Sequence, residues 1–358
     1  TGPLNGYRIV DVTSMVSGPS ATMLLADQGA DVIKVENPNG GDHTRASSNQ
    51  RAGVSANFLN NNRNKRSVAL NLKDPRGVDA LMKLVETADV FIQNFRPGVV
   101  DRMGIGEDAV RAVAPNIVYV SISGFGERGD YSHKPVYDPL IQAISGLATV
   151  QAGSDQERPR LVRTILPDKL TGIVAAQAIS AALLARERGA GGQRVDVSLL
   201  ESGVSLLSYH GVAYTAGRVQ PEREGAGFST ISPYGVYRAR NGDILIGAPS
   251  QPMWLKACAV LNAPELADDP RYESNVERCR HDDDLRKDLE ARLAADDVDI
   301  WIERFEAAGV ATAPMNTLEQ VFQDKQVLAN DMVVPAKRPD GTTVDLLGLP
   351  FKLSGTPG

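Results

Sequence analysis

One carboxylate in the sequence stands where a nucleophile would be useful. Asp168 precedes a long apolar stretch, residues 173–184, which Gly189 brings to an end. A carboxylate near a helix N-terminus is favoured by the helix dipole and the free N–H groups, so Asp168 could simply cap this helix. Pro167 makes the position rigid and Lys169 favours the ionised form. An ionised carboxylate at the edge of an apolar helix can also act as a nucleophile.

Cationic side chains gather in two further segments. The segment "NNNRNKRS" places Arg63, Lys65 and Arg66 directly before a predicted strand, and "NFRPGVVDRMG" adds Arg96 and Arg102 after another. In a parallel sheet, the loops that follow strands meet at one edge, where ligands bind. The clustering favours a polyphosphate ligand, although a solvated charged loop is about as frequent for so short a run.

A glycine-rich segment, "GFGERG", has the G-x-G-x-x-G spacing of dinucleotide-binding loops. Such a site needs a helix that opens directly after the glycines, so that its N-terminus meets the pyrophosphate. Here "DYSHKPVYDP" follows, with two prolines. The sequence therefore favours a flexible loop over a pocket rather than a nicotinamide site.

Strands and helices alternate through the first half of the chain, which indicates an α/β fold with a doubly wound, Rossmann-like sheet. A short strand–helix–strand unit at the N-terminus implies parallel strands. The predicted strands are residues 7–13, 31–37, 67–73, 89–95 and 116–126, and the predicted helices include 18–30 and one that begins at Asp74-Pro75. Residues 193–207 read as a strand that runs into a helix.

The chain divides into segments of different character. We expect a large α/β domain over 1–204, a linker over 205–224, a small α+β domain over 225–305, and a linker with a C-terminal return to the large domain over 306–358. The small domain should contain a hairpin around Asn241-Gly242, which is a strong two-residue turn signal.

Composition narrows the function classes. The 358 residues carry a net charge of −6 with 42% hydrophobic and 23% charged residues, as in a soluble enzyme, and we expect no nucleic-acid partner. Two cysteines and four histidines, without a C-x-x-C pair, argue against a metal site and favour a reducing cytoplasm. No signal peptide is visible, and no run approaches the roughly 20 apolar residues of a membrane span, so we expect no membrane partner.

Several segments together resemble one known family, the class III CoA-transferases (CaiB/BaiF), which includes formyl-CoA transferase and is related to α-methylacyl-CoA racemase. The resemblance rests on the order of segments along nearly the whole chain, among them "RIVDVTSMVSGPSATMLLADQGADVIKVENPNGGDHTR", "NRNKRSVALNLKDPRG", "DVFIQNFRPGVVDRMGIG" and "GQRVDVSLLESGV". It implies an interlocked homodimer, CoA and acyl-CoA as substrates with a small carboxylic acid as co-substrate, and no tightly bound cofactor.

The resemblance also implies roles for individual residues. Asp168 occupies the position of the family's catalytic aspartate, and Tyr137 matches a pocket tyrosine close to the thioester. Backbone N–H groups near Gly124 would stabilise oxyanions. The implied CoA-binding residues are Val16 and Ser17 at the thiol end, Asn94, Phe95, Arg102 and Met103 along the cofactor, and Arg63, Lys65 and Arg66 near the adenine and phosphates.

The implied reaction is nucleophilic catalysis, in which Asp168 forms an acyl-aspartyl anhydride and then an aspartyl-CoA thioester. The racemase relative has a histidine where Tyr137 stands, and tyrosine, with a pKa near 10, is a poor α-proton base, although His133 is close in sequence. Racemase chemistry and a non-catalytic CoA-binding protein remain the alternatives. The lid of formyl-CoA transferase has its nearest match at residues 223–229, and Arg160 and Arg163 could meet an acceptor carboxylate or form surface ion pairs.

Overall fold

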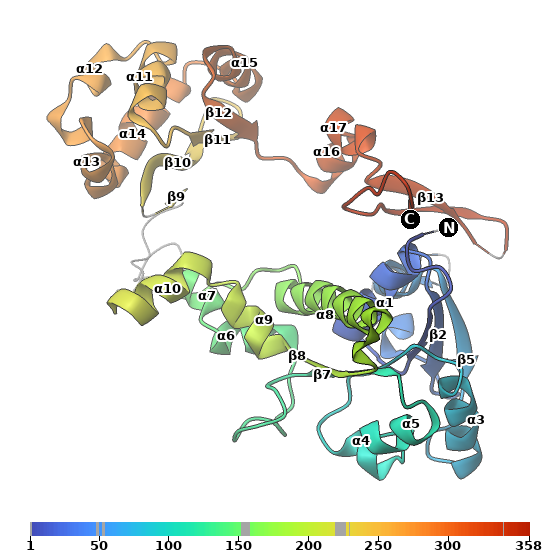
Figure 1. The fold of residues 1–358 in the computed structure, drawn as a ribbon. Coiled ribbons are helices and arrows are strands. Elements are labelled where there is room, and N and C mark those ends of the chain that lie inside the picture. The colour runs from blue at the N-terminus through green and yellow to red at the C-terminus, as the bar shows by residue number, and fades with distance from the viewer. Residues whose placement is uncertain are drawn as a thin grey trace. The chain divides into compact units, whose positions relative to one another are not determined.

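The structure is a computed structural model that describes residues 2–47, 50–51, 54–151, 158–218, 227–228, 230–338 and 340–358. The chain divides into two compact units (Figure 1). Unit 1 consists of Thr1–Ala148, Leu161–Val212 and Lys325–Gly358, and unit 2 of Thr149–Arg160 and Ala213–Asp324. The candidate lid at residues 223–229 lies outside the described residues, apart from the backbone of two positions in a short strand.

A six-stranded sheet forms the centre of unit 1, in the order β5-β2-β1-β6-β7-β8. Every neighbouring pair of strands is parallel, which confirms the predicted parallel α/β sheet. The strands are β1 (Arg8–Asp11), β2 (Asp31–Glu36), β5 (Lys65–Ala69), β6 (Val90–Gln93), β7 (Val118–Ser123) and β8 (Arg194–Ser198).

Helices cover both faces of this sheet, as the doubly wound arrangement requires (Figure 1). One face packs against α1 (Ser17–Asp27) and α8 (Leu166–Ala185). The other packs against α3 (Pro75–Val85) and α5 (Glu107–Val113). Strands β6 and β7 are buried along their whole length because both of their faces are covered, which explains their mostly apolar sequence.

Helix α8 crosses from β7 to β8, and its composition follows from that position. By length and composition alone, Leu166–Ala190 is apolar enough to cross a membrane. This differs from the expectation that no run of the chain approaches the length of a membrane span. Core helices of soluble proteins pass the same test. Gly172 faces α1 so closely that a Cβ there would lie 2.3 Å from Ser20 Oγ. This close packing of the two helices places the N-terminal turn of α8 beside that of α1.

The other elements of unit 1 are shorter. Helix α9 (Leu199–Ser205) follows β8 directly, as predicted for a strand that runs into a helix. The remaining elements are β3 (Gln50–Arg51), β4 (Val54–Ser55), α2 (Ala56–Asn62), α4 (Val99–Arg102), α6 (Asp138–Ile144), α17 (Lys325–Ala329), β13 (Val333–Lys337) and β14 (Thr343–Leu347), with a 3-10 helix at His43–Ala46 and a π-helical turn at Arg186–Ala190. Helices α7 (Leu147–Val150) and α10 (Ser208–Gly217) cross the boundary between the units.

Unit 2 is built on an antiparallel sheet in the order β12-β11-β10-β9. Strands β10 (Ile231–Arg238) and β11 (Asp243–Gly247) pair through Arg238 and Asp243, which confirms the predicted hairpin. Strand β12 (Ala311–Pro314) lies within the segment expected to be a linker. The other elements are β9 (Gly227–Phe228), α11 (Gln251–Val260), α12 (Pro264–Ala267), a 3-10 helix (Pro270–Tyr272), α13 (Asn275–Arg280), α14 (Asp282–Leu293), α15 (Val298–Ala308) and α16 (Leu318–Gln323).

Candidate active site

Asp168 is the third residue of α8 and does not cap the helix. The N-cap residue is Ile165, which makes no side-chain cap, and Pro167 occupies the first turn, where its missing N–H costs no helical hydrogen bond. The Asp168 carboxylate lies in the first turn of α8, where the helix dipole favours a negative charge, but it is not the N-cap, so capping does not explain its position.

A second carboxylate holds the backbone of Asp168. The Asp168 N–H donates to Asp138 Oδ2 at 3.1 Å, and Asp138 is buried. The amide of Gln142 donates to Asp138 Oδ1 at 2.6 Å and to the Val162 carbonyl at 3.0 Å, and it accepts from the Val162 N–H at 2.8 Å. Helix α6 thus fixes the segment that leads into α8.

Burial raises the pKa of Asp168 to about 6, and the negative charge of Asp138 adds to the effect. The Lys169 ammonium and a hydrogen bond from Ser17 lower this pKa, but they do not outweigh burial. Lys169 thus favours the ionised form, as expected, but burial has the larger effect on the pKa of Asp168. Asp168 is mostly ionised above pH 6 and poorly solvated, and a poorly solvated carboxylate is a stronger nucleophile than one in water.

Lys169 is occupied by a different partner. Its Nζ donates to Asn61 Oδ1 at 2.5 Å, and Asn61 is fully buried. Burial and the nearby Arg63 lower the pKa of Lys169 to about 8, while Asp168 raises it. Lys169 therefore influences Asp168 through its charge, not through an ion pair among the described contacts.

The loop after β1 lies beside Asp168 and is held in an unusual conformation. Met15 has a φ of 72°, a left-handed value that is rare for a residue with a side chain. Its N–H donates to Asp42 Oδ1 at 3.3 Å, and Asp42 pairs with the fully buried Lys34 at 2.9 Å. Buried contacts thus stabilise the loop that presents Val16 and Ser17, the first of which is the N-cap residue of α1.

Asn94 contributes to the site through this same loop. Its Oδ1 accepts from the Ser14 N–H at 3.0 Å, and its Nδ2 donates to the Ser14 carbonyl at 2.8 Å. Both polar atoms of the Asn94 amide are used in this way. Asn94 therefore positions the loop after β1. Its place in the predicted CoA-contacting stretch did not indicate this role.

A pocket of about 620 Å³ opens at the carboxyl edge of β1, β2, β5 and β6. It contains two of the predicted CoA-binding residues, Phe95 and Met103, together with Ser14 of the β1 loop. The other lining residues are Val12, Thr13, Val35, Glu36, Asn37, Asn39, Gly40, Gly41, Asp42, His43, Ala46, Leu70, Asn71, Leu72, Lys73 and Val99.

Most of this lining was missed at the sequence level. Residues 37–43 follow β2 and residues 70–73 follow β5, so the rule that ligands bind after the strands of a parallel sheet would have found them. Lys73 is the lysine of this pocket. Arg102, in contrast, is exposed at the end of α4 and does not line the pocket.

The three predicted phosphate-binding cations do not lie in this pocket, and each has an acidic partner. Arg63 pairs with Asp27 at 2.6 Å, Lys65 with Asp11 at 3.1 Å and Arg66 with Asp31 at 2.7 Å. Strand β5 begins at Lys65 rather than at residue 67, so Lys65 and Arg66 lie in its amino end and Arg63 precedes it. The Lys65 and Asp11 side chains are fully buried, which indicates a structural role.

Gly124 and Tyr137 lie in the segment between β7 and α6, which leads to Asp138, the partner of the Asp168 N–H. A Cβ at Gly124 would lie 2.2 Å from Val136 Cγ1, so only glycine allows the two segments to approach. Tyr137 is exposed and directly precedes Asp138. No helix opens after the glycines until Asp138, which confirms that this is not a dinucleotide-binding turn. Nearby His133 is exposed, like Arg160 and Arg163.

Among the described residues, no group of three or more His, Cys, Asp or Glu side chains is placed to hold a metal ion. The site that the structure assembles consists of Asp168, its neighbours Ser17 and Asp138, and the β1 loop. Since that loop also lines the large pocket, a ligand seated in the pocket would extend along it toward Asp168.

Known proteins resemble the chain along its whole length. The family profile described as CoA-transferase family III matches residues 4–358. The chain is 39% identical over 351 residues to a mouse succinyl-CoA:glutarate CoA-transferase, covering 97% of the chain and 79% of that protein. It is 33% identical over 354 residues to the acetyl-CoA:oxalate CoA-transferase of Acetobacter aceti, covering 99% and 90%. A CaiB/BaiF family protein from Brucella suis has a crystal structure with a TM-score of 0.89 at 31% identity, covering 99% of the chain and 94% of that protein.

Proposed function

The chain belongs to CoA-transferase family III, and on that premise we propose that it transfers CoA between two carboxylic acids through covalent intermediates on Asp168. The observation that carries the proposal is the position of Asp168 in a buried site next to the loop that lines the large pocket. Its pKa of about 6 leaves the carboxylate ionised at neutral pH and poorly solvated.

The first half of the reaction releases the donor acid. An Asp168 oxygen attacks the thioester carbonyl of the donor acyl-CoA, the C–S bond breaks, and an acyl-aspartyl anhydride and a CoA thiolate form. The thiolate then attacks the aspartyl carbonyl of the anhydride. The donor leaves as a free carboxylate, and CoA is bound to Asp168 as a thioester.

The second half repeats these steps in reverse order with the acceptor. The acceptor carboxylate attacks the aspartyl thioester and expels the CoA thiolate, which gives a new mixed anhydride. The thiolate attacks the acceptor acyl carbon, and the Asp168 carboxylate is released. Each step exchanges one carboxylate or thiolate for another, so no net proton or electron is consumed.

Several described residues support these steps. The Ser17 hydroxyl, which bonds the Asp168 carboxylate, and backbone N–H groups near Gly124 would stabilise the oxyanions in this proposal. The apolar part of the large pocket suits an adenine ring, with Phe95 and Met103 as its contacts and Lys73 as a phosphate partner. Arg102 stays a candidate CoA contact. Arg63, Lys65 and Arg66 are left out of the proposed CoA contacts because their charges are already paired.

For substrates we propose short dicarboxylic acids, because the relatives are named for succinate, glutarate and oxalate. The proposal includes the homodimer of the family and a cytoplasmic enzyme. Light scattering of the purified protein tests the dimer.

The test is intact-mass spectrometry of the protein after incubation with succinyl-CoA, followed by hydroxylamine. We expect a hydroxamate that maps to residue 168 and is lost in Asp168→Asn. Turnover by that variant should fall at least about a thousandfold, as is usual when a nucleophile is removed. Asp79→Asn, a change in an exposed residue of α3 that belongs to neither pocket, is the matched control and should keep both the adduct and the turnover.

Three other results would contradict the mechanism. An adduct that persists in Asp168→Asn would place the nucleophile elsewhere. Solvent deuterium at the α-carbon of an acyl-CoA, without any adduct, would favour the racemase alternative. CoA binding without turnover of succinyl-, acetyl- or oxalyl-CoA with any dicarboxylate would refute the proposed substrate class.

A further inference from the structure

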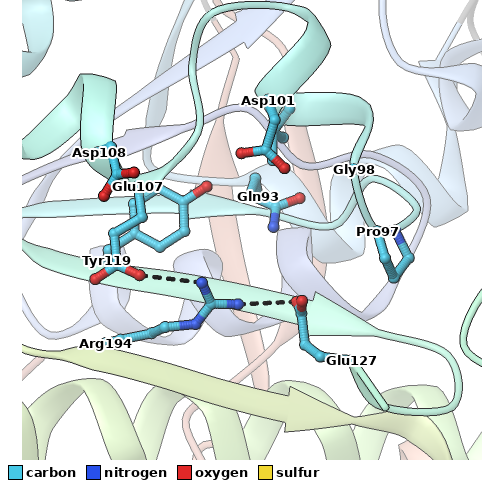
Figure 2. A pocket seen from close by; sticks show the side chains of 10 residues that line it. Gln93, Pro97, Gly98, Asp101, Glu107, Asp108, Tyr119, Glu127 and Arg194 are labelled. Atoms are coloured by element: carbon cyan, nitrogen blue, oxygen red, sulfur yellow. Dashed lines mark hydrogen bonds and ion pairs between the residues drawn. The ribbon is translucent and has the colours of Figure 1, made fainter. Parts of the chain in front are cut away.

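A second pocket, of about 180 Å³, lies in unit 1 and shares no lining residue with the large one (Figure 2). Its walls come from β6, β7, β8, α4 and the start of α5, and they are mostly polar. The lining residues are Gln93, Pro97, Gly98, Val100, Asp101, Glu107, Asp108, Tyr119, Glu127 and Arg194.

The buried end of the pocket holds a hydroxyl that lacks a partner. Tyr119 is 1% exposed, and its oxygen makes no hydrogen bond within the described part of the chain. Figure 2 shows this hydroxyl directed toward Asp101 and Gln93. The Gln93 amide is already used, because it donates to Ser121 at 2.8 Å and accepts from the Phe95 N–H at 2.8 Å. A buried polar group of this kind normally has a partner, so the pocket contents must supply it.

The charge of the pocket indicates what that partner carries. Arg194 is the cation of the lining, and Figure 2 shows its guanidinium paired with Glu107 and Glu127. Asp196 pairs with the same guanidinium. Asp101 and Asp108 are exposed and take part in no ion pair among the described residues. Burial raises the pKa of Tyr119, and the nearby acids, Asp101 among them, raise it further, whereas Arg194 lowers it. The pocket is therefore negative and rich in acceptors.

We propose that this pocket binds a small organic ammonium ion, whose N–H groups donate to the Tyr119 oxygen and to the carboxylate of Asp101. An anion would meet the uncompensated acids, which excludes it. A bare metal ion would need a tighter set of ligands than the described residues offer. An ammonium supplies both the charge and the directed donors that the lining lacks. The inference does not depend on the proposed transferase function.

Saturation-transfer NMR on the full chain tests this with methylammonium as the probe. Tetramethylammonium is the matched control, because it carries the same charge and similar methyl protons but no N–H donor. We expect methylammonium to bind at one saturable site and tetramethylammonium not to bind. Tyr119→Phe and Asp101→Asn should each weaken binding about tenfold, the effect of one lost hydrogen bond to a charged group.

Asp79→Asn, on the exposed side of α3, is the control variant and should bind methylammonium as the wild type does. Asp101 is exposed, so Asp101→Asn keeps the test valid if Tyr119→Phe fails to fold. Equal signals from both probes, equal competition by potassium chloride, or unchanged binding in both pocket variants would overturn the proposal.

Discussion

The backbone N–H of Asp168 donates to Oδ2 of Asp138 at 3.1 Å, so the buried Asp138 is tied directly to the half-buried Asp168. Asp138 positions the first turn of α8 and also raises the pKa of Asp168 through its negative charge. Ser17 acts in the opposite direction, since its hydrogen bond lowers that pKa. The basicity of the proposed nucleophile is therefore set first by burial and then adjusted by neighbours with opposing effects.

The first prediction concerns the pH dependence of adduct formation. The rate should fall as pH decreases through about 6, where Asp168 becomes protonated. Asp138→Asn removes a negative charge, so this acid limb should move to lower pH, whereas Ser17→Ala should move it to higher pH. Single-turnover rates of succinyl-CoA cleavage between pH 5 and 8 measure both shifts. Two variants that shift the limb in the same direction would contradict the assignment.

The second prediction concerns stability. The pKa of Asp168 rises from 3.8 to about 6 on folding, so its ionised form is disfavoured in the native state. Any stabilisation from the raised pKa is present below pH 4 and lost as pH rises through 6. Asp168→Asn should therefore stabilise the protein by up to about 3 kcal/mol at pH 8, and the gain should shrink as pH falls toward 4. Urea denaturation at several pH values measures this, and a gain independent of pH would disprove the explanation.

The third prediction concerns the contact between α1 and α8. In Gly172→Ala, the new Cβ would lie 2.3 Å from Ser20 Oγ and 2.9 Å from the Ser17 carbonyl, so α8 must move. We expect a loss of about 1–3 kcal/mol in stability and slower adduct formation, because the turn that carries Asp168 moves too. Gly211→Ala is the matched control, since its nearest neighbour is Leu207 Cβ at 3.5 Å. That helix substitution should be neutral or slightly stabilising in thermal denaturation.

The fourth prediction compares the effect on acyl-CoA binding of a lysine that lines the large pocket with that of an arginine held in an ion pair. Lys73→Ala removes the lysine of the large pocket and should raise the KM for acyl-CoA about tenfold, with a smaller effect on kcat. Arg66→Ala breaks an exposed ion pair with Asp31 and should change stability by less than about 1 kcal/mol and leave KM unchanged. Steady-state kinetics of both variants provide the measurement. A raised KM in Arg66→Ala alone would restore the interpretation based on the sequence.

Local sequence patterns predicted the architecture of the chain well. Apolar runs bounded by turn residues identified β1, β2, β6 and β7, because strands covered on both faces are mostly apolar. Asp74-Pro75 marked the start of α3, where Asp74 caps the helix. The hairpin at Asn241-Gly242 followed from turn chemistry alone. These features depend on neighbours in sequence and need no knowledge of distant contacts.

The roles of charged residues could not be predicted in the same way. Arg63, Lys65 and Arg66 look like a phosphate-binding cluster, but their partners Asp27, Asp11 and Asp31 lie more than thirty residues away along the chain. The pKa of Asp168 likewise depends on burial and on Asp138, which only folding brings together with it.

The sequence by itself thus determined which elements form, and it identified Asp168 as a candidate nucleophile through its place before an apolar helix. Only the tertiary structure decided which cations remain free, which loops line the large pocket, and how basic Asp168 is. The physical reason is range: strand and helix formation follows local side-chain patterning, whereas charge pairing and desolvation depend on groups that become neighbours only when the sheet assembles.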